Sequence, residues 1–361
     1  MTGALEMTYP ALTLRMCLGE AGSSDVAGAD WAELLRVARR NYVLLRLAAR
    51  LEELGARAPA YFSEAVEEER RRASAIFGVV RGVGRACEAG GVEHLFAKSF
   101  QHYPDMGGDI DLYVARRTSS VDEAVLAGTP ASPVRKDFRS LMSGVTAYRV
   151  GGGEFVLEIF HGRLGVLGEH GALVGQLIRN AERARVGGGE FLLPSPEDLL
   201  VLHGMQRVYR HGFIRLCDVL STASLVGRAG LDWDYVLRTS EQLGTAYGLR
   251  SYLTYVGQIY REALGRELLP AGLRARLAAD DCGRGEFRNG VFVFPRGRVV
   301  GRVYLGKVRA AVRAGNWGSV SRLSLMPLVA AAALARKVGT RAAAAATLAD
   351  SLIDTSAYLI R

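Results

Sequence analysis

Two aspartates separated by one residue, Asp109 and Asp111, are the side chains whose types and spacing point most directly to chemistry. They stand in the run Asp-Ile-Asp-Leu-Tyr-Val. Residues i and i+2 of a β-strand point to the same face, so a strand here holds both carboxylates side by side and turns Ile110 and Leu112 the other way. Two adjacent carboxylates repel each other unless a cation lies between them. Hard oxygen ligands suit Mg²⁺, so the pattern predicts a divalent metal that carries a phosphate.

A third acid, Glu158, stands in the apolar run Leu-Glu-Ile-Phe and completes a triad if its strand lies beside the first. Three carboxylates can hold one or two Mg²⁺ (or Mn²⁺) ions, which neutralise charge at an α-phosphorus and activate an attacking oxygen. The simpler interpretation is that Glu158 is an ordinary outward-facing strand residue, and Glu154 is the second candidate for the third ligand.

Residues flanking the acidic pair are suited to phosphate binding. Ser99 and neighbouring backbone N–H groups are expected to hold the outer phosphates, and Lys98 is either a phosphate contact or a surface lysine. Gly107 and Gly108 allow the backbone to approach a phosphate closely.

The elements that must position these residues follow from periodicity. Residues 1–30 are expected to be a loose or partly ordered lead-in, and helices are expected over Trp31–Leu54 and Tyr61–Ala89. Asp30 and Ser195 are predicted helix N-caps, and Gly55 a helix stop. The predicted strands are Glu93–Phe100, Asp109–Ala115, Leu141–Val150 and Glu154–Phe160, the last two joined by Gly151–Gly153. Later helices are predicted over Ala172–Ala184, Pro196–Tyr209, Ile214–Val226, Asp232–Leu243 and Tyr247–Leu264, then a β-like segment within 284–304 and helix to Arg361.

Composition narrows the class of protein. The chain has 361 residues and a net charge of +9, and only four of its 46 basic residues are lysines. A GC-rich genome explains most of this arginine bias, and the remaining positive charge favours a polyanionic ligand. Four widely spaced cysteines argue against a zinc site or a disulfide framework. The sequence shows no signal peptide and no apolar run long enough to span a bilayer, which predicts a cytoplasmic protein without a membrane partner.

The spacing of Ser99, the two aspartates and a third acid on a later strand resembles the DNA polymerase β-like nucleotidyltransferase superfamily. One branch, an uncharacterised nucleotidyltransferase family with Lys-Gly, Tyr-Pro and Asp-Ile-Asp-Leu, is more similar still. The matching residues here are Lys98-Ser99, Tyr103-Pro104 and Asp109-Ile110-Asp111-Leu112. Further similarity lies in Leu157–His161, Leu193–Leu200, His203, Arg215, Asp218 and Leu231–Trp233, so that the resemblance covers about residues 90–265.

Two departures from the family pattern bear on activity. Ser99 replaces the branch's glycine but agrees with the Gly-Ser of the wider superfamily. An arginine often present between Tyr-Pro and the aspartates is absent, and residues 105–108 (Asp-Met-Gly-Gly) stand there. The simpler and preferred interpretation of this helical region is a buried Arg215–Asp218 ion pair among surface groups. The alternative is that Arg207 or Arg215 points at the nucleotide or the acceptor, with Arg215 as the candidate nucleotide contact.

The resemblance implies an α+β fold with a small mixed sheet forming a nucleotidyltransferase core, N-terminal helices and a C-terminal helical domain. The expected divisions are residues 1–89, 90–190 and 191–361. The implied activity moves a nucleoside monophosphate from an NTP, ATP first among them, to a small molecule, protein or RNA, and releases pyrophosphate. One alternative is a nucleotide- or partner-binding protein with little or no activity, favoured by the missing arginine. Another is a transferase acting on tRNA ends, favoured by net charge. The arginines of Pro295–Arg313 either form a basic face that binds the acceptor or are solvated surface residues.

Overall fold

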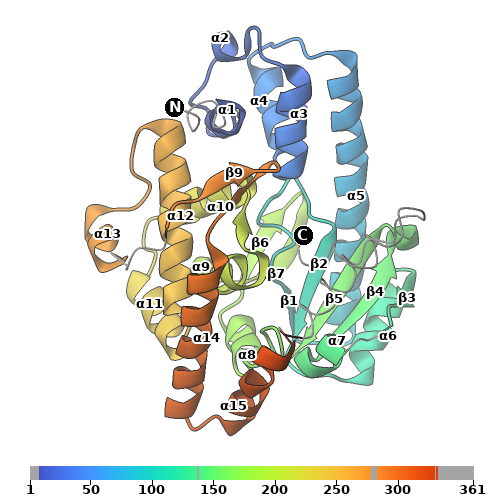
Figure 1. The fold of residues 1–361 in the computed structure, drawn as a ribbon. Helices are drawn as coiled ribbons and strands as arrows, with labels where there is room; N and C mark the ends of the chain where they lie inside the picture. The colour runs from blue at the N-terminus through green and yellow to red at the C-terminus, as the bar shows by residue number, and fades with distance from the viewer. Residues whose placement is uncertain (1–7, 136–137, 278–282, 330, 332–361) are drawn as a thin grey trace, which may run out of the picture.

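A five-stranded sheet carries the acidic motif (Figure 1). The computed structural model describes residues 8–135, 138–277, 283–329 and 331. The strand order is β1-β2-β5-β4-β3, in which β2 runs parallel to β5 and the other neighbours are antiparallel. The predicted α+β fold with a mixed sheet is confirmed. The strands are β1 (His94–Phe96), β2 (Asp109–Val114), β3 (Ala131–Pro133), β4 (Val145–Val150) and β5 (Phe155–His161).

Helices precede and follow the sheet, as predicted. The first group is α1 (Thr8–Cys17), α2 (Ser23–Val26), α3 (Trp31–Arg40), α4 (Leu44–Glu53) and α5 (Ala60–Ala89). Two short helices connect strands of the sheet along the chain: α6 (Ser119–Gly128) follows β2, and α7 (Phe138–Ser143) follows β3. The later helices are α8 (Leu173–Arg179), α9 (Pro196–Gln206), α10 (Leu216–Val226), α11 (Trp233–Gln242), α12 (Ala246–Leu264), α13 (Ala271–Leu277), α14 (Arg296–Arg313) and α15 (Trp317–Ser324). Small sheets add β6 (Glu182–Val186), β7 (Gly189–Leu193), β8 (Phe213–Ile214), β9 (Glu286–Arg288) and β10 (Val291–Val293).

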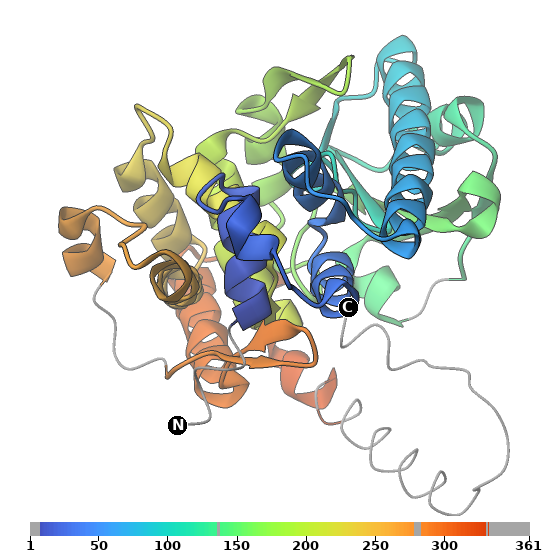
Figure 2. The same cartoon turned by 90° about the horizontal axis from the view of Figure 1, so that it is seen from above.

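The two faces of β2 are buried against different partners. Ile110 and Leu112 belong to the large apolar core that includes the inner face of α5. Tyr113 and Phe160 point to the other face and join a second cluster with residues of α8 and α9. Seen from above, the sheet and α5 lie on one side and α11 to α14 on the other (Figure 2). The alternation of β2 therefore turns its aspartates toward the helical half.

The N-terminal region is more ordered than expected. Residues 1–7 lie outside the described residues, but α1 and α2 follow, and Leu14 and Met16 of α1 are fully buried. The single helix predicted over Trp31–Leu54 is wrong, because a turn at Asn41–Val43 separates α3 from α4. The predicted N-cap at Asp30 and stop at Gly55 are confirmed.

Three predicted elements are shorter than expected. The strand that begins near Glu93 stops at Phe96, and residues 97–105 form successive turns. The strand predicted from Leu141 begins at Val145, after α7. The helix predicted to Ala184 ends at Arg179, and a β6–β7 hairpin follows. Each boundary depends on which distant residues the segment meets, which local periodicity does not report.

Three cysteines lie within the described residues, and none of them forms a disulfide. Cys17, Cys87 and Cys217 are free thiols, and burial raises the pKa of the first two to about 12 and about 11. No helix in the described part of the chain combines the length and apolar character needed to cross a bilayer. The alanine-rich helix predicted to Arg361 and the fourth cysteine, Cys282, fall outside the described residues.

Candidate active site

The buried carboxylate of Asp111 is the centre of the candidate site. Its side chain is 6% exposed, and Lys98 Nζ lies 2.9 Å from its Oδ2 atom. Its Oδ1 atom is buried without a hydrogen-bond partner among the described residues. A buried ionised oxygen without a partner is costly. Asp111 therefore has one oxygen neutralised by the chain and one that still requires a donor or a cation.

The register of β2 and β5 places Glu158 beside Asp111. The two residues are directly paired, and Asp109 is paired with Val156. Paired residues of neighbouring strands point to the same face, so the three acids share the face opposite Ile110. Glu154 lies before β5 and is exposed. The expected grouping of Asp109, Asp111 and Glu158 is therefore present, while their role as metal ligands stays a prediction.

The turns between β1 and β2 bring Lys98 and Ser99 onto this face. The backbone N–H of Asp111 donates to Ser99 Oγ over 3.2 Å. The backbone N–H of Ala97 donates to the Asp111 carbonyl oxygen over 3.1 Å. These two hydrogen bonds attach the first turn to the middle of β2, and this is why Lys98 meets the Asp111 carboxylate.

The two glycines before β2 stand next to open space. A Cβ atom on Gly108 would meet no atom within 4 Å, and one on Gly107 would approach only the Asp109 backbone, at 3.9 Å. Neither glycine has a positive φ, so the local backbone does not itself require glycine. The predicted approach of a phosphate to Gly107 and Gly108 is sterically open and stays a prediction.

An arginine from α5 reaches the loop in which the sequence lacks one. Arg72 donates hydrogen bonds to the carbonyl oxygens of Met106 and Gly107, the second over 3.4 Å. Its side chain is only 28% exposed, and its guanidinium group also pairs with Glu69. Positive charge therefore stands beside the chain that leads into Asp109, although it comes from a helix far away in sequence.

The acid of that loop, Asp105, has a structural partner. Its carboxylate accepts hydrogen bonds from the backbone N–H groups of Leu45 and Arg46, over 2.8 and 3.3 Å, in the first turn of α4. Burial raises the pKa of Asp105 to about 6, against the lowering effect of these two hydrogen bonds. Asp105 therefore ties the loop to the N-terminal helices.

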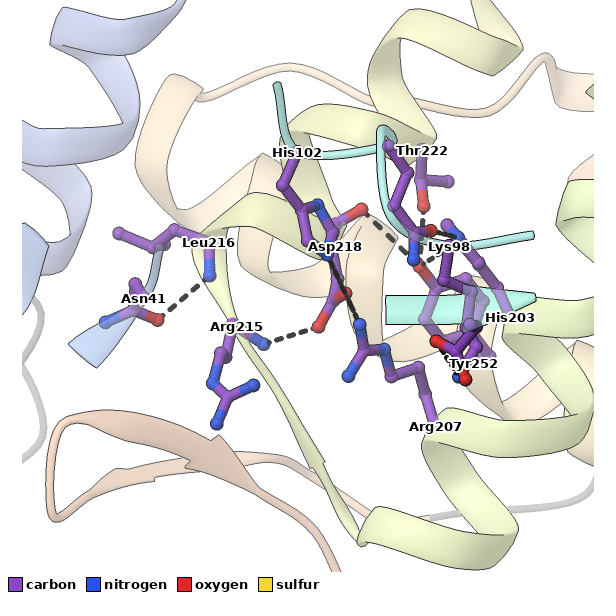
Figure 3. A network of polar contacts seen from close by, with 12 residues as sticks. Asn41, Lys98, His102, His203, Arg207, Arg215, Leu216, Asp218, Thr222 and Tyr252 are labelled. Atoms are coloured by element: carbon purple, nitrogen blue, oxygen red, sulfur yellow. Dashed lines mark hydrogen bonds and ion pairs between the residues drawn. The ribbon is translucent and has the colours of Figure 1, made fainter. Parts of the chain in front are cut away.

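A second buried acid, Asp218, is the centre of a group of polar contacts (Figure 3). Arg207 Nη2 lies 2.8 Å and His102 Nε2 lies 3.8 Å from its Oδ1 atom. The backbone N–H of Arg215 donates to its Oδ2 atom over 2.9 Å. The preferred interpretation, an Arg215–Asp218 side-chain ion pair, is therefore wrong, because Arg207 is the side-chain partner. Burial, and next the charge of Arg207, lowers the pKa of His102 far below its usual value, so this ring is neutral at pH 7.

The side chain of Arg215 lies between two aromatic rings. Its guanidinium carbon is 4.4 Å from the ring centre of Tyr42 and 4.8 Å from that of Phe213. Tyr42 has a φ of +52°, a conformation that non-glycine residues adopt rarely and that is frequent at functional sites. The structure groups Arg215 with the Asp218 cluster, and its predicted contact with nucleotide stays a prediction.

His203 links the turn containing Lys98 to the helical half. Its Nδ1 atom lies 3.0 Å from the hydroxyl of Tyr252, and its Nε2 atom forms a hydrogen bond with the side chain of Gln101. Burial, followed by the charges of Arg207 and Lys98, lowers the pKa of His203 to about 3. A neutral ring with both nitrogens engaged positions the turn and does not exchange protons near pH 7.

Two groups of side chains offer ligands for a cation, and they differ in suitability. The carboxylates around Asp111 supply only oxygen atoms, which Mg²⁺ and Mn²⁺ prefer, and one of these oxygens is buried without a partner. The ligand atoms of His102, Cys217 and Asp218 also lie within 4.8 Å of one another. However, burial raises the pKa of the Cys217 thiol, and Arg207 already pairs with Asp218. The residues around Asp111 fit the predicted ion, and the second group does not.

The fold and the site define a class of α+β proteins in which acids on adjacent strands of a mixed sheet face a basic helical half. The chain belongs to a family described as an uncharacterised nucleotidyltransferase family, whose model matches residues 27–261. The predicted family is therefore confirmed, and the match begins well before residue 90, so that it includes α3 to α5. No curated protein and no solved structure matches the chain.

Several residues near the site were not singled out from the sequence. Arg72 lies within the predicted helix Tyr61–Ala89, and Asn41 and Tyr42 lie within the predicted helix Trp31–Leu54, so their positions in the sequence indicated no role at the site. Asn41 in fact accepts a hydrogen bond from the backbone of Leu216 over 2.9 Å at the start of α10. No local pattern marks these roles, because each depends on a partner at least thirty positions away in sequence.

Proposed function

We propose that the protein is a metal-dependent nucleotidyltransferase that moves a nucleoside monophosphate from an NTP to an acceptor and releases pyrophosphate. The observation that carries this proposal is Asp111. Its carboxylate is buried, one oxygen lacks a partner among the described residues, and Glu158 and Asp109 share its face. Family membership supports the transferase class, and the oxygen-only ligand set favours Mg²⁺ or Mn²⁺.

In this proposal Asp109, Asp111 and Glu158 hold the metal, which supplies charge neutralisation at the α-phosphate when it is bound. Glu158 either completes the ligand set or accepts the proton of the acceptor hydroxyl. The acceptor oxygen forms a bond to the α-phosphorus, and the bond from that phosphorus to the bridging oxygen breaks. Pyrophosphate leaves with the electron pair of that bond.

Residues of the β1–β2 turns bind the leaving group. Ser99 and the backbone before Gly108 would contact the outer phosphates. Lys98, which pairs with Asp111 in this structure, would bind a phosphate oxygen and leave the Asp111 carboxylate available as a metal ligand. Arg72 contributes positive charge beside residues 106–107, where the family pattern has an arginine of the loop itself. Arg215 is the candidate contact from the helical half. ATP is the first nucleotide to test, and the acceptor is a small molecule, a protein or RNA.

A protein that binds nucleotide or a partner without turnover is the second candidate. The Lys98–Asp111 ion pair favours it, because an amino group already neutralises the carboxylate that a metal would need. The loop without an arginine favours it as well.

One experiment separates these candidates. Each NTP labelled at the α-phosphate is incubated with the protein and Mg²⁺ or Mn²⁺, with and without RNA, and pyrophosphate release and label transfer are followed. We expect release with the wild type and at least a hundredfold loss in Asp111→Asn, with little change in Glu123→Gln, an exposed residue of α6. Nucleotide binding that is unchanged in Asp109→Ala, with no pyrophosphate from any NTP, would contradict the enzyme and favour the second candidate.

A further inference from the structure

Positive charge is concentrated in one segment of the chain. Residues 287–349 contain 11 of the 46 basic residues and none of the 37 acidic ones. The rest of the chain therefore has 35 basic residues against 37 acidic ones. The net charge of +9 thus arises entirely from this acid-free segment, whose longest described helix is α14.

Three exposed arginines of α14 lie along one line. Arg302, Arg309 and Arg313 are separated by seven and four residues, which at 3.6 residues per turn places them on one helix face, about 10 Å and about 6 Å apart along the axis. Neither Arg309 nor Arg313 has an ion pair or hydrogen bond with the described residues. Some exposed arginines elsewhere in the described residues, such as Arg261 and Arg276, pair with a carboxylate, whereas others, such as Arg71, do not.

These arginines border a groove of about 600 Å³ between α14 and the start of α12. The groove exists because α14 packs backbone to backbone there: a Cβ atom on Gly306 would lie 2.5 Å from the Gly244 carbonyl oxygen. The guanidinium carbon of Arg302 lies 5.0 Å from the ring centre of Tyr247. The first turn of α12 contains no acid and its N-cap side chain makes no cap hydrogen bond, so the end of this helix contributes positive potential. One acid, Glu241, also lines the groove, and its carboxylate lies 3.8 Å from Arg250.

We propose that this groove binds the phosphate backbone of a single-stranded nucleic acid. A row of arginines can contact several phosphates along one strand, and the exposed face of the Arg302 guanidinium, supported by Tyr247, offers a plane on which a base stacks. The groove is concave, which suits a strand better than the flat surface of a lipid bilayer. An acidic peptide would supply charge but no base for that plane. The proposal concerns binding alone and does not depend on the transferase activity.

The test uses a fluorescein-labelled 15-nucleotide single-stranded RNA, its DNA equivalent and the full-length protein at several salt concentrations. We expect micromolar or tighter binding that weakens as salt rises. The triple variant Arg302→Gln/Arg309→Gln/Arg313→Gln is expected to weaken binding at least tenfold. Its slope of log affinity against log salt is expected to be smaller by about 2, the value for three lost phosphate contacts on a single strand.

A matched control removes the same charge elsewhere. Arg71, Arg81 and Arg85 are exposed residues of α5 with no ion pair to the described residues, and their triple glutamine variant is expected to change affinity less than twofold. Equal weakening in both variants would mean that binding depends only on the net charge of the protein, and would overturn the proposal. Binding of the wild type to vesicles with anionic lipid but to neither oligonucleotide would overturn it as well. Circular dichroism melting of each variant tests whether unfolding is the cause of weaker binding. The same RNA is also titrated against Asp111→Asn, whose unchanged affinity would separate this site from the proposed transferase site.

Discussion

The amino group of Lys98 and the carboxylate of Asp111 form an ion pair of 2.9 Å in the middle of the candidate site. A cation of the chain thus stands where the acidic motif predicts a metal. If the metal and Lys98 compete for this carboxylate, the ion pair opposes metal binding until a nucleotide gives Lys98 another anionic partner. The site would then be loaded by metal and nucleotide together.

Replacing Lys98 with methionine tests this competition. We expect Lys98→Met to bind Mn²⁺ about tenfold more tightly than the wild type without nucleotide, because the competing amino group is gone, and to transfer nucleotide more slowly. Electron paramagnetic resonance of free Mn²⁺ measures the first effect and pyrophosphate release the second. Arg81→Gln, at an exposed position of α5, is the control. Unchanged Mn²⁺ affinity in Lys98→Met would argue against competition.

The register of β5 distinguishes two glutamates that the sequence leaves as alternatives. Glu158 is paired with Asp111, whereas Glu154 is exposed before the strand begins. Glu158→Gln is expected to lower pyrophosphate release at least a hundredfold, and Glu154→Gln less than twofold. Steady-state rates at saturating nucleotide and metal give the comparison. A larger effect at Glu154 would mean that the third acid is assigned to the wrong residue.

Arg72 is expected to act on nucleotide binding through the loop that it holds. Arg72→Met removes the hydrogen bonds to the carbonyl oxygens of Met106 and Gly107. We expect KM for the nucleotide to rise about tenfold and kcat to fall less, while Arg72→Lys restores part of the loss because charge is kept. If Arg72→Met and wild type have the same KM, the charge beside this loop has no part in binding.

Two arginines near Asp218 should differ in their effect on stability. Arg207→Met leaves the fully buried Asp218 carboxylate without its side-chain partner, and such a loss costs about 3–5 kcal/mol. Arg215→Met keeps the backbone hydrogen bond to Asp218 and removes stacking on Tyr42 and Phe213, worth about 1–2 kcal/mol. Urea unfolding measures both. Equal losses would show that Arg207 is not the partner that the structure identifies.

A buried ion pair joins α14 to the segment after β5. Lys307 Nζ lies 2.7 Å from Glu169 Oε1, and both side chains are 1% exposed. Burial by itself would raise the pKa of Glu169, but the charges of Lys307 and His170 and the hydrogen bonds from Lys307 and the Leu167 backbone together outweigh it, and the pKa falls to about 2. Burial, and then the charge of Lys307, lowers the pKa of His170 to about 3.

Both shifts have the same sign for stability against pH. The unfolded chain takes up protons on His170 below about pH 6.5 and on Glu169 below about pH 4.5, while the folded chain resists both, so stability falls as pH falls from 6.5 toward 3. In Lys307→Met the Glu169 carboxylate is buried without its cation, so we expect a loss of about 3–5 kcal/mol at pH 7 and a smaller loss at pH 5. Urea unfolding at several pH values measures this, and the double variant Lys307→Met/Glu169→Gln should recover most of it. No recovery would exclude the ion pair as the cause.

Part of the candidate site could be predicted from short stretches of sequence alone. The alternation of Asp109 and Asp111 with Ile110 and Leu112 is a property of any strand, so their faces could be predicted without a structure. The caps at Asp30 and Ser195 depend on residues two or three positions away and are present as predicted. The motif and its spacing also identified the family. The division at residues 89 and 190, the cytoplasmic location and the identities of metal, nucleotide and acceptor stay predictions.

Only the tertiary structure decided which side chains meet at that motif. The pairing of β2 with β5 sets Glu158 beside Asp111, and the turns after β1 bring Lys98 to the same carboxylate. Arg72 contacts Met106 of the β1–β2 loop, 34 positions away in sequence. Arg207, and not Arg215 as the sequence suggested, forms the ion pair with Asp218. These contacts depend on strand order and helix packing. Both are determined by how apolar side chains from the whole chain are buried together, and a local pattern of residues does not contain that information.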